Sequence, residues 1–281
     1  MELSIIIPIR DEEESIKPLY FELKDVLDSL TLTYEIIFVE NCSTDSSVIE
    51  IEAIKLLDKN VWLFSTKGKG GKSEALMVGF KRAAGKYIMT MDGDLQDVPG
   101  EIPKFLNKIK DCDMVTGWKQ KRKDPTNKLI ASKIANKVTN LIARTKVHDM
   151  NCGFKLYRRK VIKDLDLKKG FHRYIPMLLT SKGYKIGEVK VKHRKRKYGK
   201  SKYGVSRLFR GFYDLIRVLM ITKKSFFIYL WVGAFVTILN IFLLWLLIDK
   251  FHIPTIISSS LVVGGIFFLK FWIYKITGFT K

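Results

Sequence analysis

Cysteine and acidic residues are both scarce in this chain. The three cysteines, Cys42, Cys112 and Cys152, are far apart and have neither the spacing of a metal cluster nor that of a disulfide framework. We therefore expect reduced thiols, as in the cytoplasm. Aspartate and glutamate total 28 against 50 lysines and arginines, a formal net charge of +22. This imbalance favours an anionic partner, which could be nucleic acid, anionic lipid or a phosphorylated substrate.

Two short motifs are also missing. Residues 1–20 hold no signal peptide, because the charged stretch from Arg10 to Glu14 follows directly after a short apolar run. The glycine-rich segment before Lys72 lacks the first glycine of a nucleotide-binding P-loop, since Thr66 stands in its place. The second absence excludes a P-loop ATPase.

Long uncharged runs lie near the C-terminus. Phe226–Ile248 is 23 residues without a charged side chain, and Ile253–Leu269 is a second run of 17. We predict two membrane helices at about 226–248 and 253–275, in preference to a buried soluble hairpin. Basic residues flank the outer ends of the hairpin, so the positive-inside rule places both termini in the cytoplasm. Between 204 and 225, apolar residues mix with arginines, a pattern typical of a helix in the membrane interface.

The first 120 residues alternate between strand-like and helix-like patterns. Period-2 apolar runs predict strands at Leu3–Ile9, Glu35–Glu40, Val61–Phe64, Tyr87–Met91 and Asp113–Gly117. Helical patterns lie between them, at Ser15–Leu30, Ser46–Leu57, Ser73–Ala84 and Ile102–Lys110. A basic helix at about 127–143 and strands at Phe154–Tyr157 and Lys185–Val191 follow. This alternation predicts an α/β, Rossmann-like fold with a mostly parallel sheet, whose ligands bind at the carboxyl ends of the strands.

The segment after the fourth predicted strand carries the most informative motif. Asp92 and Asp94 stand at alternate positions past the strand end, with Gly93 between them and Gln96 two residues on. Glycine has no Cβ to block a close approach. Carboxylate and amide oxygens suit Mg²⁺ or Mn²⁺, which accept the phosphates of a nucleotide as further ligands. The alternative is an acidic turn, but the strand context, Gln96 and the Pro99 stop favour a metal and diphosphate site.

Together with other segments, this motif resembles the inverting family-two glycosyltransferases of GT-A fold. The resemblance is strongest to the polyprenyl-phosphate sugar synthases, such as dolichyl-phosphate mannose synthase and the undecaprenyl-phosphate glucosyltransferases. It spans Ile5 to about Asp214. It rests on the order and spacing of IIIPIRDEEES at 5–15, FVENCSTDSS at 38–47, GGKSEAL at 70–76, DGDLQD at 92–97, DMNCGFKLYRR at 149–159, HRYIP at 172–176 and RKYGKSKYG at 196–204.

The sequence departs from the family pattern in two turns. Arg10-Asp11 stands where the family usually has Tyr-Asn, and Glu40-Asn41-Cys42 stands where it usually has Asp-Asp-Gly. Because these turns contact the nucleoside in the family, the departures leave the choice of base open.

The resemblance implies a donor site. Asp92 and Asp94 would be the catalytic metal residues, with Gln96, and would neutralise charge on the departing nucleoside diphosphate. The other donor-binding residues would be Pro8, Ile9, Glu12 and Glu40 near the nucleoside, Lys72 and Gly93 near the diphosphate, and Arg194, Lys200, Ser201 and Lys202 in a basic lid. Glu12 could instead suit a helix N-terminus, and the basic loop could instead attract anionic headgroups.

The resemblance also implies an acceptor site. Arg122, Lys128 and Ser132 match positions that hold the acceptor phosphate, with a solvated helix face as the alternative. A phosphate is already anionic near neutral pH, since its second pKa is about 6, so it needs cations and no general base. His172 and Arg173 resemble an element near the acceptor, with helix capping or packing as the alternative.

We therefore predict a cytoplasmic GT-A domain (1–203), an interface region (204–225) and a transmembrane hairpin (226–281) in the cytoplasmic membrane. The enzyme would transfer one hexose, from GDP-mannose or UDP-glucose, to undecaprenyl or dolichyl phosphate with inversion. It would use Mg²⁺ or Mn²⁺, bind no nucleic acid, and could form a homo-oligomer.

Three alternatives stay open. A diacylglycerol glycosyltransferase would need a base, for which Asp149 is the candidate. A processive polysaccharide synthase is disfavoured, because no tryptophan stands in a Gln-x-x-Arg-Trp motif. A basic membrane protein that binds anionic lipid or nucleic acid would explain the charge but not the acidic motif.

Overall fold

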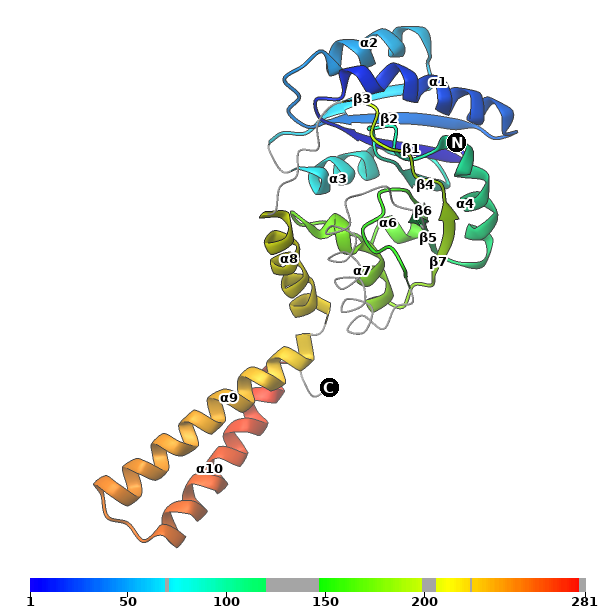
Figure 1. The fold of residues 1–281 in the computed structure, drawn as a ribbon. Coiled ribbons are helices and arrows are strands. Elements are labelled where there is room, and N and C mark those ends of the chain that lie inside the picture. Colours follow the sequence, from blue (N-terminus) through cyan, green and yellow to red (C-terminus); the bar gives the residue numbers. More distant parts are fainter. Residues whose placement is uncertain (69–70, 120–146, 199–205, 223, 278–281) are drawn as a thin grey trace. The chain divides into compact units, whose positions relative to one another are not determined.

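A seven-stranded sheet forms the centre of the N-terminal part of the molecule (Figure 1). The computed structural model describes residues 1–68, 71–119, 147–198, 206–222 and 224–277. The strands are β1 (Leu3–Ile9), β2 (Tyr34–Glu40), β3 (Val61–Ser65), β4 (Tyr87–Thr90), β5 (Met114–Lys119), β6 (Lys155–Arg158) and β7 (Ile186–Val191). Their order is β3-β2-β1-β4-β6-β5-β7, and every pair is parallel except the two that β6 makes. The predicted α/β fold is confirmed.

Helices cover both faces of this sheet. The helices of the N-terminal part are α1 (Glu13–Ser29), α2 (Ser47–Leu57), α3 (Lys72–Arg82), α4 (Ile102–Lys108), α6 (Arg159–Ile162) and α7 (Ile175–Ser181), with 3₁₀ turns η1 (Pro99–Glu101), η2 (Ile109–Asp111) and η3 (Phe171–Tyr174). Alternate residues of β1, such as Ile5 and Ile7, share a buried core with residues of α1, α2 and α4. On the opposite face Ile6 packs against Gly79 of α3, which leaves no room for a Cβ at that position.

The carboxyl ends of β1, β2 and β4 meet at one edge of the sheet. The register pairs Ile9 with Glu40, so the turns that follow β1 and β2 are neighbours. Three residues with side chains adopt left-handed backbone conformations in these turns: Asp11 (φ 46°), Cys42 (φ 57°) and, after β4, Leu95 (φ 59°). Such conformations are uncommon outside glycine and often occur where a functional site over-determines the backbone.

The second compact unit is Ile216–Lys281, and the first is Met1–Leu215. The boundary lies within α8 (Ser206–Thr222), the helix predicted for the interface region. The second unit contains α9 (Lys224–Trp245), a π-helical turn η4 (Leu246–Lys250) and α10 (Thr255–Ile276).

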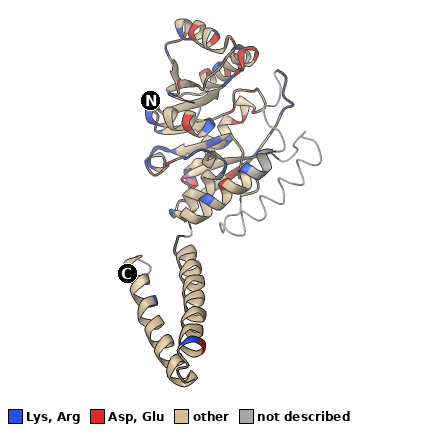
Figure 2. Cartoon of the chain, turned by 90° about the vertical axis from the view of Figure 1, so that its left-hand side faces the viewer, with Lys and Arg blue, Asp and Glu red and all other residues tan. Residues whose placement is uncertain are grey.

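Two helical segments of the second unit, Phe226–Lys250 and Thr255–Ile276, are long and apolar enough to cross a membrane. Only 6% and 17% of their most apolar windows are buried within the chain, so these helices are not the core of a soluble fold. Figure 2 shows almost no charged residue along them apart from the turn that joins them and one end of α10. The apolar hairpin is found where it was predicted, and its passage through a bilayer stays a prediction.

Candidate active site at the carboxyl edge of the sheet

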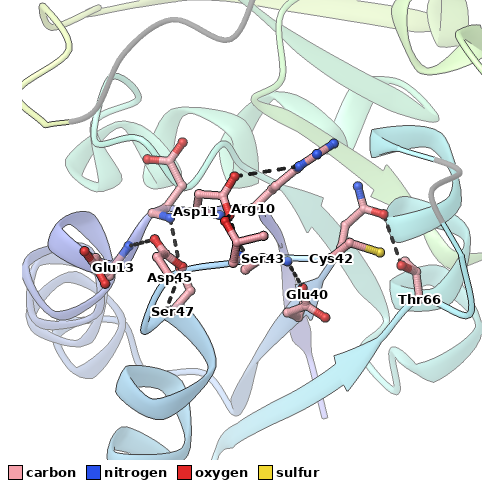
Figure 3. Close-up of polar contacts among 12 residues, drawn as sticks. Arg10, Asp11, Glu13, Glu40, Cys42, Ser43, Asp45, Ser47 and Thr66 are labelled. Carbon is pink, nitrogen blue, oxygen red and sulfur yellow. Dashed lines mark hydrogen bonds and ion pairs between the residues drawn. The ribbon is translucent and has the colours of Figure 1, made fainter.

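The turns after β1 and β2 hold each other through hydrogen bonds (Figure 3). The Asp11 N–H donates to Ser43 Oγ at 3.1 Å, and Asp11 Oδ1 accepts from the Thr44 N–H at 2.7 Å. The Ser46 N–H donates to Glu13 Oε2 at 2.8 Å. The last of these bonds satisfies the N–H of Ser46, the N-cap of α2, which the helix cannot satisfy internally. The interlocked turns therefore give the predicted nucleoside residues a fixed frame.

Within this frame the two predicted acidic residues have different surroundings. The Glu40 carboxylate accepts the Ser43 N–H and is largely buried. Glu12 precedes α1 but makes no side-chain capping bond. Instead its Oε1 pairs with Arg196 Nη1 at 3.2 Å. Glu12 is thus the N-cap residue of α1, as the alternative interpretation expected, and its carboxylate also pairs with the basic segment after β7. Cys42, at the position where the family usually has glycine, takes a glycine-like left-handed φ.

The two aspartates of the acidic motif each meet a cation. The Asp92 carboxylate pairs with the Lys72 ammonium at the N-terminus of α3. Asp94 Oδ2 pairs with Arg196 Nη2 at 2.6 Å. Burial, followed by the neighbouring charge of Asp92, raises the pKa of Asp94 to about 6. Burial also acts to raise the pKa of Asp92, but Lys72 and other cations outweigh it and hold that pKa below its usual range.

Two glycines make close contacts at the acidic motif. A Cβ on Gly153 would lie 2.5 Å from Asp92 Oδ2, so the carboxylate rests directly on the Gly153 backbone. A Cβ on Gly93 would lie 2.5 Å from Ile9 Cδ1. A side chain at position 93 would therefore require the Ile9 side chain to move, which gives Gly93 a packing role on β1 beside the role that the sequence suggested. Ile9 is 1% exposed beneath this loop, whereas Pro8 beside it is half-buried.

A buried ion pair lies next to the acidic motif and contacts its backbone. Asp97 is fully buried, and its Oδ1 lies 2.7 Å from Lys119 Nζ at the end of β5. The other oxygen of Asp97 accepts the Asp92 N–H at 3.4 Å. Burial by itself would lower the pKa of Lys119, but Asp97 raises it, so the ammonium stays charged. The sequence analysis did not single out this pair, although Asp97 belongs to the DGDLQD segment.

Lys155 is a second residue that sequence reasoning missed. It stands on β6 opposite Thr90 of β4, and only 2% of it is exposed. Burial lowers its pKa to about 8, while the charge of Asp92 acts in the opposite direction. A lone lysine within the apolar strand FKLY was the available signal. The antiparallel insertion of β6 next to β4 brings this cation within electrostatic range of Asp92.

The basic segment after β7 is joined to the acidic motif through its backbone. Gln96 O accepts the Arg194 N–H at 2.9 Å, and Gln96 Nε2 donates to Arg194 O at 3.3 Å. The Arg194 guanidinium instead pairs with Glu22 at 2.7 Å. Arg196, two residues on, is the guanidinium that reaches Asp94 and Glu12. The predicted residues Lys200, Ser201 and Lys202, and the acceptor residues Arg122, Lys128 and Ser132, lie outside the described residues.

The remaining candidates lie around η3. His172 Nδ1 is 2.9 Å from Ser73 Oγ, next to Lys72 on α3. Arg173 Nη1 is 2.7 Å from Asp214 Oδ2 on α8, so its charge is directed to that helix. Asp149 is 2% exposed, and its N–H donates to Glu188 Oε1 at 3.2 Å.

His172 gives a pH-dependent stability prediction. Burial, followed by the charges of nearby Lys72 and Arg173, lowers its pKa well below 6.5, so the folded protein keeps the imidazole neutral. The unfolded chain binds a proton below pH ~6.5, so the free energy of unfolding should fall by up to about 1.4 kcal/mol per pH unit below that value. Chemical denaturation between about pH 7.5 and 5 tests this. The His172→Gln variant should lose this component, and equal slopes in both proteins would contradict it.

The donor set of the acidic motif fits a hard divalent cation. Asp92 and Asp94 supply carboxylate oxygens on one loop and Gln96 an amide oxygen. Within the described ranges, no group of three or more His, Cys, Asp or Glu residues could hold a metal ion by itself. Mg²⁺ and Mn²⁺ sites with one or two carboxylates are usually completed by waters and substrate phosphates. The arrangement therefore suits a cation that binds together with a nucleoside diphosphate.

Comparison with known proteins agrees with this chemistry. Residues 4–166 match the family described as glycosyl transferase family 2. The chain is 33% identical to dodecaprenyl-phosphate galacturonate synthase of Rhizobium johnstonii, over 96% of this chain and 83% of that protein. It is 30% identical to undecaprenyl-phosphate 4-deoxy-4-formamido-L-arabinose transferase of Salmonella choleraesuis, over 78% of this chain and 68% of that protein.

Solved structures share the fold. Glucosyl-3-phosphoglycerate synthase from Mycobacterium tuberculosis, in complex with Mn²⁺, UDP and phosphoglyceric acid, aligns with a TM-score of 0.62 at 16% identity, over 79% of this chain and 78% of that one. A complex of the same enzyme with Mg²⁺ and UDP gives a TM-score of 0.59 at 14% identity.

The sheet topology and the solved structures define a GT-A-like α/β domain, and the family match over residues 4–166 makes the chain a glycosyltransferase. The chain belongs to glycosyl transferase family 2, and the resemblance seen in its sequence is confirmed. Membership of an enzyme family sets aside the non-enzymatic alternative.

Proposed function

We propose that the chain transfers one sugar from a nucleotide sugar to a polyprenyl phosphate in the membrane, with inversion at the anomeric carbon. In the reaction, an acceptor phosphate oxygen forms a bond to the anomeric carbon, and the bond from that carbon to the donor diphosphate breaks on the opposite face. The observation that carries the proposal is the aspartate pair between Lys72 and Arg196 at the sheet edge. The two relatives, both named as polyprenyl-phosphate sugar enzymes, support it.

Different residues at the carboxyl edge of the sheet would bind different parts of the donor. Asp92, Asp94 and Gln96 would hold Mg²⁺ or Mn²⁺, which supplies Lewis-acid stabilisation of the departing diphosphate. Lys72 and Arg196 already lie against these carboxylates, so they are placed to donate to phosphate oxygens. Pro8, Glu12 and Glu40 would line the nucleoside pocket between the interlocked turns.

The acceptor side needs cations in place of a base. A lipid monophosphate carries its nucleophilic charge near neutral pH, because its second pKa is about 6. Asp149, the base that a diacylglycerol acceptor would require, is almost completely buried, which disfavours contact with a lipid hydroxyl. We assign the phosphate to Arg122, Lys128 and Ser132, and propose that the apolar hairpin anchors the enzyme with both termini in the cytoplasm.

The sequence and the relatives indicate different donor sugars. GDP-mannose and UDP-glucose are the hexose donors that the sequence indicates. The names of the relatives add galacturonate and a formamido-arabinose. Because one relative is named for galacturonate, an activated galacturonate is the second candidate.

A donor panel tests the proposal. The purified full-length protein in detergent would receive radiolabelled GDP-mannose, UDP-glucose or UDP-galacturonate, with undecaprenyl phosphate and Mn²⁺ or Mg²⁺. We expect one donor to give a chloroform-soluble, acid-labile product that disappears with EDTA. Diacylglycerol in place of the prenyl phosphate is the matched acceptor control. Product with diacylglycerol alone, or no product from any donor with folded protein, would contradict the proposal.

A further inference from the structure

We propose that Asp214 of α8 is a positioning residue. Its ion pair with Arg173, together with the contacts of Tyr174 and Gly170 with α8, forms what we call the clasp. The clasp fixes α8 on the glycosyltransferase domain and so presents the active site to an acceptor embedded in a bilayer. This inference rests on the proposed function for its acceptor. It concerns contacts within Met1–Leu215 alone. It gives Arg173 a role other than contact with the acceptor, because its guanidinium is directed to α8.

Three contacts hold the same face of α8. Arg173 Nη1 lies 2.7 Å from Asp214 Oδ2, and the two side chains are only 14% and 11% exposed. The Tyr174 hydroxyl donates to Gly211 O at 2.7 Å, one helical turn before Asp214. Gly170 has φ +89° and packs directly on the Asp214 carboxylate, so a Cβ there would collide with it. A carboxylate removed from water in this way is stable only with a charged partner.

The opposite face of α8 is apolar and open. Phe212 and Tyr213 are 64% and 63% exposed. Gly211 and Asp214 are three residues apart, which places them on one face of a helix, and Phe212 points to another. A helix with aromatic and aliphatic residues on one side and charge on the other is suited to lie in a membrane interface. The clasp therefore joins a membrane-facing helix to the soluble domain.

The segment that holds α8 also touches the active site. His172, between Gly170 and Arg173, bonds Ser73 Oγ through its ring at 2.9 Å and its N–H at 3.3 Å. Ser73 follows Lys72, whose ammonium pairs with Asp92. The contacts from Asp214 to Asp92 are thus continuous through η3 and the start of α3. Loss of the clasp would leave the donor-binding residues in place. It would change the position of the active site relative to a lipid phosphate, whose depth is fixed by the bilayer.

Asp214→Asn is the first variant, because it removes the charge and keeps the shape. The wild type and the variant, full-length in lipid nanodiscs, would be assayed with undecaprenyl phosphate and with a short, water-soluble prenyl phosphate. We expect turnover with undecaprenyl phosphate to fall at least about tenfold and turnover with the short acceptor to change less than about twofold. The matched control is Asp113→Asn, which removes an ion pair of equal length, 2.7 Å to Lys160, away from α8.

Two further variants and one physical measurement complete the test. The exchanged pair Arg173→Asp with Asp214→Arg should restore most of the lost turnover, and Gly170→Ala should reproduce the loss. Hydrogen exchange at amides 206–215 should rise at least about tenfold in Asp214→Asn. Equal loss with both acceptors, no loss with either, or unchanged exchange would overturn the proposal. Absence of product in the wild type would count against the proposed function, whereas the exchange result would still decide the clasp.

Discussion

Replacing Asp94 by asparagine is expected to reduce sugar transfer at least about a thousandfold. The side chain keeps its shape but loses the charge that a divalent cation requires, and metal stabilisation of a leaving group contributes several kcal/mol, at about 1.4 kcal/mol for each tenfold in rate. Asp94 is 8% exposed and has its partner Arg196 at 2.6 Å, so solvent cannot replace the lost ligand. Initial rates of lipid product and Mn²⁺ binding, followed by electron paramagnetic resonance, would measure both effects.

The control for this prediction is Asp111→Asn. Asp111 is 68% exposed and pairs with Lys108 at 3.8 Å on the surface, so its replacement should leave the rate within about twofold of the wild type. An Asp94→Asn enzyme that keeps a tenth of the rate, or binds Mn²⁺ as tightly as before, would refute the assignment of Asp94. Membrane association should be the same in all three proteins.

Lys119→Met should destabilise the glycosyltransferase domain by about 3–5 kcal/mol, because it leaves the Asp97 carboxylate buried without its partner. Asp97 is fully buried and Lys119 is 9% exposed at 2.7 Å. The same change should weaken Mn²⁺ binding, since Asp97 also accepts the N–H of Asp92, which we propose as a metal ligand. Chemical denaturation in mild detergent gives the free energy of unfolding, and metal titration gives the second effect.

Lys160→Met is the matched control for this second prediction. Lys160 pairs with Asp113 at the same distance, 2.7 Å, but is 63% exposed, so its loss should cost about 0–1 kcal/mol. The comparison therefore separates burial from ion-pair length. Equal destabilisation by Lys119→Met and Lys160→Met would show that the Asp97 pair does not support the acidic motif.

Much of the fold was readable from local pattern. Strand positions followed from period-2 apolar runs, and the ends of all seven predicted strands fall within two residues of the observed ones. The helix predicted at Ser15–Leu30 begins earlier, at Glu13, because acidic residues suit the first turn of a helix. The acidic motif was placed correctly past β4, since a charged segment after a buried strand must lie at the end of the sheet.

The partners of the site residues were not readable. The segment after β7 contains many basic residues in a row, and nothing in their order indicates that Arg194 meets Glu22 while Arg196 meets Asp94. Likewise the sequence left Arg173 with either a place near the acceptor or a structural role, and nothing local indicated that it lies opposite Asp214. In each case the partner is distant in sequence, so no local spacing records it.

The sequence by itself determined the strand and helix positions, the acidic motif at a strand end, the apolar hairpin and the enzyme family. These depend on periodicity, composition and short motifs, which are local properties of the chain. Only the tertiary structure decided that β6 runs antiparallel between β4 and β5, which brings Lys155 to Asp92 and lets Lys119 reach Asp97. The physical reason is that alternation fixes which side chains are buried, whereas the order of the strands decides which buried charges become neighbours.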